Sequence, residues 1–195
     1  MSATPALCRV RPRDGAGELA VLARSEWPAQ PPAALPGLPG FIISSFSPLA
    51  AELAERCLCQ HFGDPPADAE RGERTAVVLA STTGDMATAA AIASAVDQGR
   101  AVPPLLFYQS NPNAVVGHIA ARWGLAGPVV CTIPATRGLA DAIDSAALLI
   151  EGAEADAALV LLAEQGGLHG DRGVAMLVGP AGWVPSAASR GTSDE

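Results

Sequence analysis

The chain has 195 residues, of which 49% are apolar and only 16% are charged, so it is long and apolar enough to form one well-packed domain. Its formal net charge is −8, and nucleic-acid binding is not expected because it needs a clustered basic face. All twelve basic residues are arginine, which excludes chemistry that requires a lysine side chain.

The first forty residues predict little regular structure. LCRVRP (residues 7–12) is compatible with an edge strand, and PAQPPAALPGLPG (28–40) is too rich in proline to sustain a helix or sheet pairing. We therefore expect residues 1–40 to be an irregular segment with a possible edge strand. FIISSFS (41–47) is compatible with a second strand or with a direct entry into a helix. Ser47-Pro48 then predicts an N-cap followed by proline at the first helical position.

The middle of the chain predicts a strand between helices. The helix that starts at Ser47-Pro48 keeps its apolar spacing to about Phe62, and a polar loop (63–74) follows. TAVVLAS (75–81) has the apolar, β-branched composition of a strand, and the Ala-rich segment 86–99 strongly favours a helix. We expect PPLLFYQ (103–109) to be a short apolar connection.

SNPNAVVGHIAARWGLAGPV (110–129) predicts an amphipathic helix that ends in a tight turn. Asn113 is a candidate N-cap, and apolar residues recur along one face as far as Trp123. Gly124 suits a left-handed helix end, and Gly127-Pro128 prevents the helix from resuming. We expect VVCTI, which follows, to be a buried strand.

The last third predicts a helix and two paired strands. The helix begins near Gly138 and runs to Ile150, with Asp141 and Asp144 in its first two turns, where negative charge suits the helix dipole. ADAALVLLAE (155–164) is apolar throughout, as expected for a strand covered on both faces, and GVAMLVG (173–179) is expected to pair with it. Strands that alternate with helices indicate an α/β fold with a mostly parallel sheet. We expect residues 184–195 to be disordered.

Other chemistry-bearing patterns are sparse. Cys57-Leu58-Cys59 lies on a predicted helix, where residues two apart point away from each other, and no second pair has zinc-site spacing, so we expect no metal. Asp85 and His118 could form a catalytic pair, but a capping aspartate and a surface histidine are the preferred interpretation. The GLHGDRG loop with His169 is interpreted as a solvated turn. No nucleotide-binding glycine motif or hydrolase elbow is present, and no cofactor is expected.

No apolar stretch is long enough to span a bilayer, and MSATPALCRVRPRD lacks the apolar core of a signal peptide. From the sequence we therefore expect a cytoplasmic protein with reduced thiols.

The 110–129 segment resembles the part of β-ketoacyl synthases in which a Pro-Asn-Ala turn precedes a Gly-His-Ile-Ala helix and a Gly-Pro break. Similar likenesses hold for TAVVLASTTGD, for residues 139–164 and for GDRGVAMLVG, so the resemblance covers roughly residues 42–180. It implies a thiolase-like half with the order βαβαβαββ, a mixed sheet covered by helices, over residues 41–183. The structural residues of the motif are then Asn113, Gly117, His118, Gly127 and Pro128.

The resemblance also implies where a nucleophile would stand. In condensing synthases a reactive cysteine follows the Gly-Pro strand and begins the next helix, where helix amides stabilise its thiolate. Eight residues after Pro128 this chain has Thr136, which cannot supply a thiolate. Cys131 lies five positions earlier and is interpreted as an inert, buried strand residue. Phe107 and Cys131 are the candidate acyl-pocket residues.

These observations predict no catalytic residue. In the family the second half supplies two catalytic histidines, and neither His61, His118 nor His169 matches them. The leading hypothesis is a non-catalytic synthase-like subunit of a polyketide or fatty-acid-type pathway, which forms a homodimer or pairs with a ketosynthase and meets an acyl carrier protein. Two alternatives stay open: an acyltransferase of the 3-oxoacyl synthase type completed by a partner chain, and a non-functional remnant.

A half of this kind is expected to leave an apolar helical face uncovered, because the second half of the family normally packs against it. The candidate interface is the Ala-rich helix, over about residues 83–96, or the helix over residues 139–150.

Overall fold

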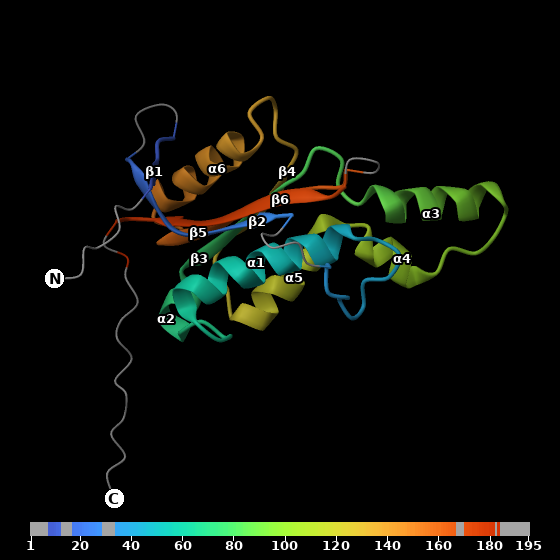
Figure 1. Cartoon of the computed structure of the whole chain (residues 1–195), viewed down its shortest axis with the longest axis horizontal. Helices are drawn as coiled ribbons and strands as arrows, with labels where there is room; N and C mark the ends of the chain where they lie inside the picture. Colours follow the sequence, from blue (N-terminus) through green and yellow to red (C-terminus); the bar gives the residue numbers. More distant parts are fainter. Residues whose placement is uncertain (1–7, 13–16, 29–33, 167–169, 182, 184–195) are drawn as a thin grey trace, which may run out of the picture.

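The computed structural model describes residues 8–12, 17–28, 34–166, 170–181 and 183. A six-stranded sheet with helices on both faces forms the body of the molecule, and two helices project from it as an arm (Figure 1). The elements are β1 (Arg9–Val10), β2 (Leu19–Trp27), α1 (Phe46–Phe62), α2 (Ala69–Glu73), β3 (Thr75–Ala80), α3 (Met86–Asp97), α4 (Pro104–Gln109), α5 (Pro112–Trp123), β4 (Val129–Thr132), α6 (Leu139–Glu151), β5 (Ala157–Glu164) and β6 (Arg172–Gly179). From β2 onward, consecutive helices counted together, this is the predicted order βαβαβαββ, so the α/β class is confirmed.

The strand order in the sheet is β1-β2-β6-β5-β3-β4. β3 pairs in parallel with both β4 and β5, whereas β6 runs antiparallel to β5 and to β2, and β1 runs antiparallel to β2. Among the described strands the sheet is thus mixed, with three antiparallel and two parallel pairs, so the expectation of a mostly parallel sheet is wrong. The carboxyl ends of β3, β4 and β5 therefore lie at one edge of the sheet. Ligands of open α/β sheets bind outside this edge, so the candidate site is built there.

Alternate residues of the central strands enter two separate cores. Val77 and Leu79 of β3 join the core under α1 and α5, whereas Val78 and Ala80 join the core under α6. Figure 1 shows α6 on one face of the sheet and α1 and α5 on the other. β5 is divided between the cores in the same way, and its first five residues are buried, which confirms the prediction of a strand covered on both faces.

The arm is formed by α3 and α4, which lie beyond the end of the sheet (Figure 1). α3 buries only Thr88 and Ala95, and α4 buries only Leu106 and Gln109. The Gln109 amide holds the arm in place, because it accepts a hydrogen bond from the Ile42 amide (3.0 Å) and donates to Thr88 Oγ1 (3.1 Å). The short apolar connection expected at residues 103–109 is the short helix α4. Pro103 and Pro104 start a helix there, and burial of its Gln109 fixes its end.

β2 is the largest departure from the sequence prediction. The expectation of an irregular segment up to residue 40 is wrong for residues 19–27, since the strand pairs with β6 from Ala20 to Trp27. A register shift between Val21 and Ala23 interrupts the alternation that would reveal the strand. Ser25 lies on the buried side, and its hydroxyl donates to the Leu53 carbonyl (2.7 Å). The expected disordered tail and the loop around His169 lie outside the described residues.

Two helices begin earlier than predicted. α1 starts at Phe46 with Ser45 as N-cap, because the Phe46 ring is fully buried, and Pro48 falls within the first turn, where its missing N–H has no intrahelical partner to lose. Of the two alternatives for FIISSFS, the direct entry into a helix is confirmed, since Phe46 and Ser47 begin α1. The segment forms no strand beyond the isolated bridge between Leu38 and Phe41.

α5 starts at Pro112, and its N-cap is Asn111 rather than Asn113. The Asn111 side chain accepts a hydrogen bond from the Asn113 amide (3.0 Å), and Pro112 takes the first helical position. The predicted helix end is confirmed, since Gly124 is left-handed with φ 67°. α2 is a short helix within the predicted polar loop, and Asp68 caps it by accepting from the Arg71 amide (3.2 Å).

The prediction that β4 is a buried strand is wrong. β4 is the last strand of the sheet and has a neighbour only on the β3 side, so Val129 and Cys131 are exposed. Its apolar, β-branched sequence therefore marks an uncovered edge within the described part of the chain.

Gly127 of the Gly-Pro break is held at a close approach. A Cβ at this position would lie 2.5 Å from the backbone oxygen of Thr75, at the start of β3. We predict that Gly127→Ala lowers the free energy of unfolding by about 1–3 kcal/mol, because backbone atoms cannot yield as side chains do. Gly117→Ala is the matched control: nothing lies within 4 Å of its Cβ, and the change is expected to stabilise α5 by about 0.8 kcal/mol. Equal effects in urea titrations would contradict this interpretation.

His61 at the end of α1 stacks on Trp183 with 5.3 Å between ring centroids, and the Arg71 guanidinium lies over the same indole. Burial, and secondarily the charge of Arg71, lower the pKa of His61. Its contribution to stability is therefore complete above the unfolded-state pKa of about 6.5 and is lost as the pH falls from there through the lower folded-state pKa. We predict a lower Tm at pH 5.5 than at pH 7.5, with a smaller difference in His61→Leu. An unchanged difference in the variant would refute the assignment.

Candidate functional site

Thr136, which the resemblance equates with the family's nucleophile, lies in the loop between β4 and α6. Thr136 is exposed there, and Gly138, with φ 54°, turns the chain into α6. The backbone amides of Thr136 and Arg137 both donate to one oxygen of Asp141, over 3.1 Å and 3.0 Å. Asp141 is in the first turn of α6, so its carboxylate reaches back over the start of its own helix.

Arg137 completes this arrangement. Its guanidinium lies 2.9 Å from the other Asp141 oxygen and also pairs with Asp144 one turn later. Hydrogen bonds from the Arg137 and Thr136 amides, together with the Arg137 charge, lower the pKa of Asp141. The Asp141 carboxylate thus binds the two loop amides and the Arg137 guanidinium. These groups would otherwise be available to stabilise an anion at Thr136. The sequence places Asp141 near the helix dipole but does not reveal its bonds to the loop.

A hollow of about 420 Å³ lies beside this loop, beyond the carboxyl ends of β3 and β4. Cys131, Thr132 and Ile133 line one side of it, and the Ser81–Asp85 turn lines the other. Cys131 is exposed here, so the expectation of a buried thiol is wrong, although the surrounding atoms remove enough water from the sulfur to raise its pKa.

The structure does not bring the two candidate acyl-pocket residues into one cavity. Phe107 is 74% exposed on α4 and borders a second hollow of about 440 Å³, which shares Ser110 with the Cys131 hollow. The assignment of Phe107 and Cys131 to an acyl pocket therefore stays a prediction. Within this chain the two residues border separate hollows.

A polar network fixes the turn on the far side of the hollow. Glu164 at the end of β5 accepts hydrogen bonds from the Thr82 amide (2.7 Å) and from the hydroxyls of Ser81 (3.3 Å) and Thr83 (3.4 Å). Sequence reasoning missed this role. The only available signal was the position of Glu164 at the end of an apolar strand. The Ser-Thr-Thr-Gly turn that it binds follows another predicted strand.

Asp85 is a capping residue, as preferred from the sequence. Its carboxylate accepts from the amide (2.9 Å) and the hydroxyl (2.8 Å) of Thr88, and it is buried. His118 lies elsewhere, in edge-to-face contact with Phe41. The two therefore form no catalytic pair.

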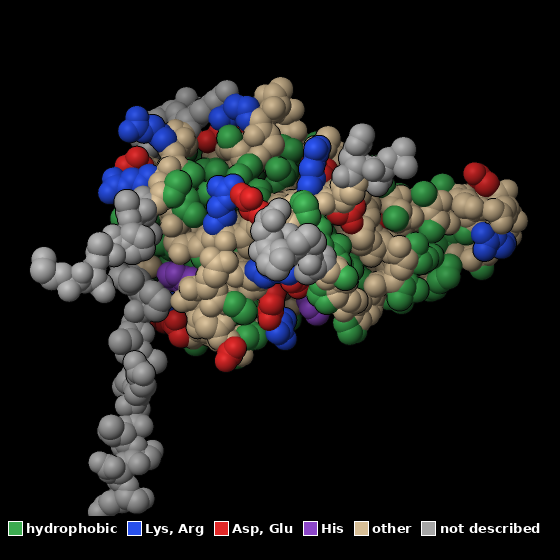
Figure 2. Space-filling model, viewed as in Figure 1, with side chains coloured by type: hydrophobic (Ala, Val, Ile, Leu, Met, Phe, Trp, Pro, Cys, Tyr) green, Lys and Arg blue, Asp and Glu red, His purple; other side chains and the backbone are tan. Residues whose placement is uncertain are grey.

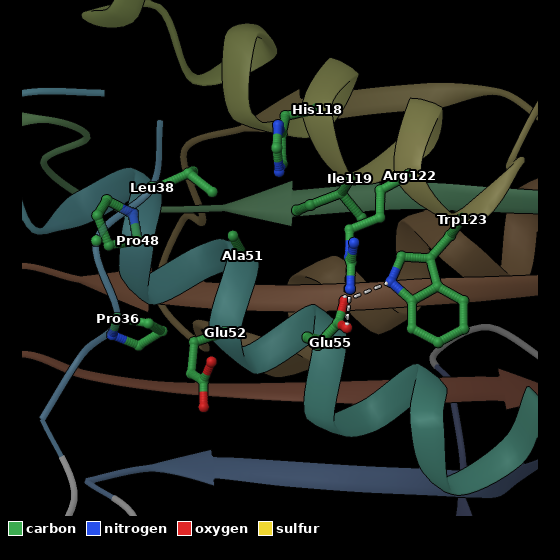
Figure 3. Close-up of a pocket in the computed structure, with 11 residues that line it drawn as sticks. Pro36, Leu38, Pro48, Ala51, Glu52, Glu55, His118, Ile119, Arg122 and Trp123 are labelled. Atoms are coloured by element: carbon green, nitrogen blue, oxygen red, sulfur yellow. Dashed lines mark hydrogen bonds and ion pairs between the residues drawn. The ribbon is translucent and has the colours of Figure 1, made fainter. Parts of the chain in front are cut away.

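His118 borders a separate pocket of about 190 Å³ between α1 and α5 (Figure 3). Here Glu55 accepts hydrogen bonds from Arg122 (2.6 and 2.8 Å) and from Trp123 Nε1 (3.0 Å), and these contacts lower the pKa of Glu55. The pocket is smaller than typical ligand sites of roughly 300–1,000 Å³, and its central charges neutralise each other. Glu55 of α1 thus connects to Arg122 and Trp123 of α5, so these pocket residues serve the packing of the two helices.

The cysteine pair on α1 behaves as its spacing predicts. Cys57 is buried, and burial raises its pKa to about 12, whereas Cys59 faces outward. Among the described residues, no group of three or more His, Cys, Asp or Glu side chains is placed to hold a metal ion. None of the helices in the described ranges has both the length and the apolar character needed to cross a membrane.

We predict that Cys131 behaves as an ordinary surface thiol and not as a synthase nucleophile. Because its pKa is raised, iodoacetamide should label it slowly at about pH 7, with a rate that still increases above about pH 9. Peptide mapping across a pH series measures this directly. A fast reaction that levels off below neutral pH would instead reveal an activated thiolate.

The family model described as the N-terminal domain of beta-ketoacyl synthase matches residues 44–166, more than half of the chain. No curated protein gives a significant match.

Several solved structures share the fold. One is a ketosynthase in complex with its chain length factor from Xenorhabdus doucetiae, with a TM-score of 0.59 and 20% identity over 77% of this chain and 64% of that one. The ishigamide ketosynthase/chain length factor gives 0.62 and 22% over 75% and 47%. A beta-ketoacyl synthase from Burkholderia phymatum gives 0.61 and 17% over 77% and 46%. The chain thus spans less than two thirds of the length of these structures.

Proposed function

The chain belongs to the beta-ketoacyl synthase family through its N-terminal domain, and we propose that it is a non-catalytic partner subunit in polyketide or fatty-acid-type biosynthesis. It would pair with a ketosynthase and support that protein's acyl site without itself carrying the acyl chain. The observation that carries this proposal is that Asp141 accepts the amides of Thr136 and Arg137. The resemblance equates Thr136 with the family's reactive cysteine, and a threonine supplies no thiol there.

Thiol chemistry explains why this observation has such weight. A condensing nucleophile must be a thiolate, which helix amides and nearby cations stabilise. A threonine hydroxyl would need a positioned base, and here the nearest helix residues contribute carboxylates that are already bound by Arg137. The two similar structures that contain a chain length factor support the idea of a paired, synthase-like subunit.

Exposed apolar residues indicate where a partner would bind. The arm exposes Met86, Val96, Leu105, Phe107 and Tyr108, and the β4 edge exposes Val129 and the adjoining Ile133. Figure 2 shows hydrophobic side chains gathered along the arm. Clusters of this kind mark protein interfaces, and an open strand edge offers backbone hydrogen bonds as well.

The outer face of α6 is a weaker candidate than the sequence suggests. Leu148 is its one large apolar residue with high exposure, at 70%, and Asp141, Asp144 and Ser145 flank the same side of the helix. We therefore assign the proposed homodimer or ketosynthase interface to the arm, which contains the Ala-rich helix, and to the β4 edge rather than to α6.

Three variants of similar exposure test this assignment. We predict that Phe107→Asp and Ile133→Asp, at residues that are each 74% exposed, raise the dissociation constant of the dimer or ketosynthase complex at least about tenfold, because a charge would be buried. Leu148→Asp is the matched control and should leave association unchanged. Light scattering measures the molar mass of each variant, alone and mixed with any ketosynthase encoded beside it. A monomer under all conditions, or a complex disrupted only by Leu148→Asp, would refute the interface.

The second candidate function is an acyltransferase or condensing enzyme completed by a partner chain. The exposed thiol of Cys131 in the hollow beside the loop is the feature that favours it. Such an enzyme would have to retain an acyl group on this chain during turnover.

A further inference from the structure

Asp141 is not among the motif residues that carry the family resemblance. It is the third residue of α6, and it binds the two loop amides through one oxygen and the Arg137 guanidinium through the other. Each contact is of hydrogen-bond length, and Asp144 holds the same guanidinium from the next turn. Thr136, Arg137, Asp141 and Asp144 are thus connected by hydrogen bonds and ion pairs, and we call this group the ionic unit.

This unit occupies the place where an anion at residue 136 would need its stabilising groups. A thiolate at a helix start depends on free amide donors and on a cation nearby. Here those donors already point at a carboxylate, and the negative charge of that carboxylate would repel a second anion. The electrostatics of the loop are therefore the reverse of those required for an activated nucleophile.

We propose that Asp141 is a built-in block of the nucleophile position, so that the loss of synthase chemistry in this chain does not depend on the threonine alone. A cysteine restored at residue 136 would remain a weak nucleophile as long as Asp141 keeps its contacts. The proposal rests on the proposed function only in equating Thr136 with the family's nucleophile position.

Three engineered variants of the full chain test it. Thr136→Cys introduces the thiol, and Thr136→Cys with Asp141→Asn removes the charge but keeps a hydrogen-bond acceptor. Thr136→Cys with Asp141→Ala frees the two loop amides and leaves Arg137 paired with Asp144 alone. Iodoacetamide labelling of the introduced thiol is followed by peptide mapping between about pH 5 and pH 10, and circular dichroism confirms that each variant is folded. Labelling at about pH 7 should increase in that order, by at least about tenfold from the single variant to the Asp141→Ala variant, since each unit of pKa changes the thiolate fraction tenfold.

A single variant that labels as fast as the Asp141→Ala variant would overturn the proposal. If the Asp141→Ala variant fails to fold, the Asp141→Asn variant alone decides, because removal of the charge must still accelerate labelling. The result is independent of partner binding. An acyl group found on the unmodified chain would refute the proposed function. It would leave the order of the labelling rates in the three variants unchanged.

Discussion

Burial of β5 on both faces is the constraint from which the rest of the architecture follows. An apolar central strand must be covered from both sides, so α1 and α5 occupy one face of the sheet and α6 the other. α6 can cover β5 and β3 only if the chain turns sharply after β4. That turn brings residues 133–138 to the carboxyl edge of the sheet, beside the hollow and the Ser81–Asp85 turn. The position of the candidate site is therefore a consequence of packing.

The chemistry at that position depends on side chains that packing leaves free to vary. In this chain the helix start serves its own Asp141, and Arg137 connects the loop to two carboxylates. The same ionic unit that stabilises the turn also removes the donors that an acyl-transfer site would use. Apolar surface is meanwhile concentrated at the arm and the β4 edge. The proposed role as a subunit that acts through association rests on these two features, the bound helix start and the exposed apolar surface.

Much of the fold could be predicted from the sequence where a local pattern and the tertiary environment agree. The Ala-rich α3, the buried β5 and the left-handed Gly124 are examples, since composition or a single glycine suffices there. β2 could not be predicted because a register shift hides its alternation, and the exposure of Cys131 could not because edge and central strands share the same composition. Counting along the motif places Thr136 after β4, but its equivalence to a nucleophile stays a prediction. The contacts of Asp141 and Glu164 could not be predicted because they depend on how the loops fold back.

Intact-mass analysis of the assembled complex tests the central claim most directly. This chain and any ketosynthase encoded beside it are incubated with an acyl thioester of an acyl carrier protein, and the mass of each subunit is measured separately after rapid quenching. If this chain is a non-catalytic partner, the acyl mass is found on the ketosynthase and this chain keeps its unmodified mass. A stoichiometric acyl adduct on this chain, mapped to residues 131–138, would contradict it.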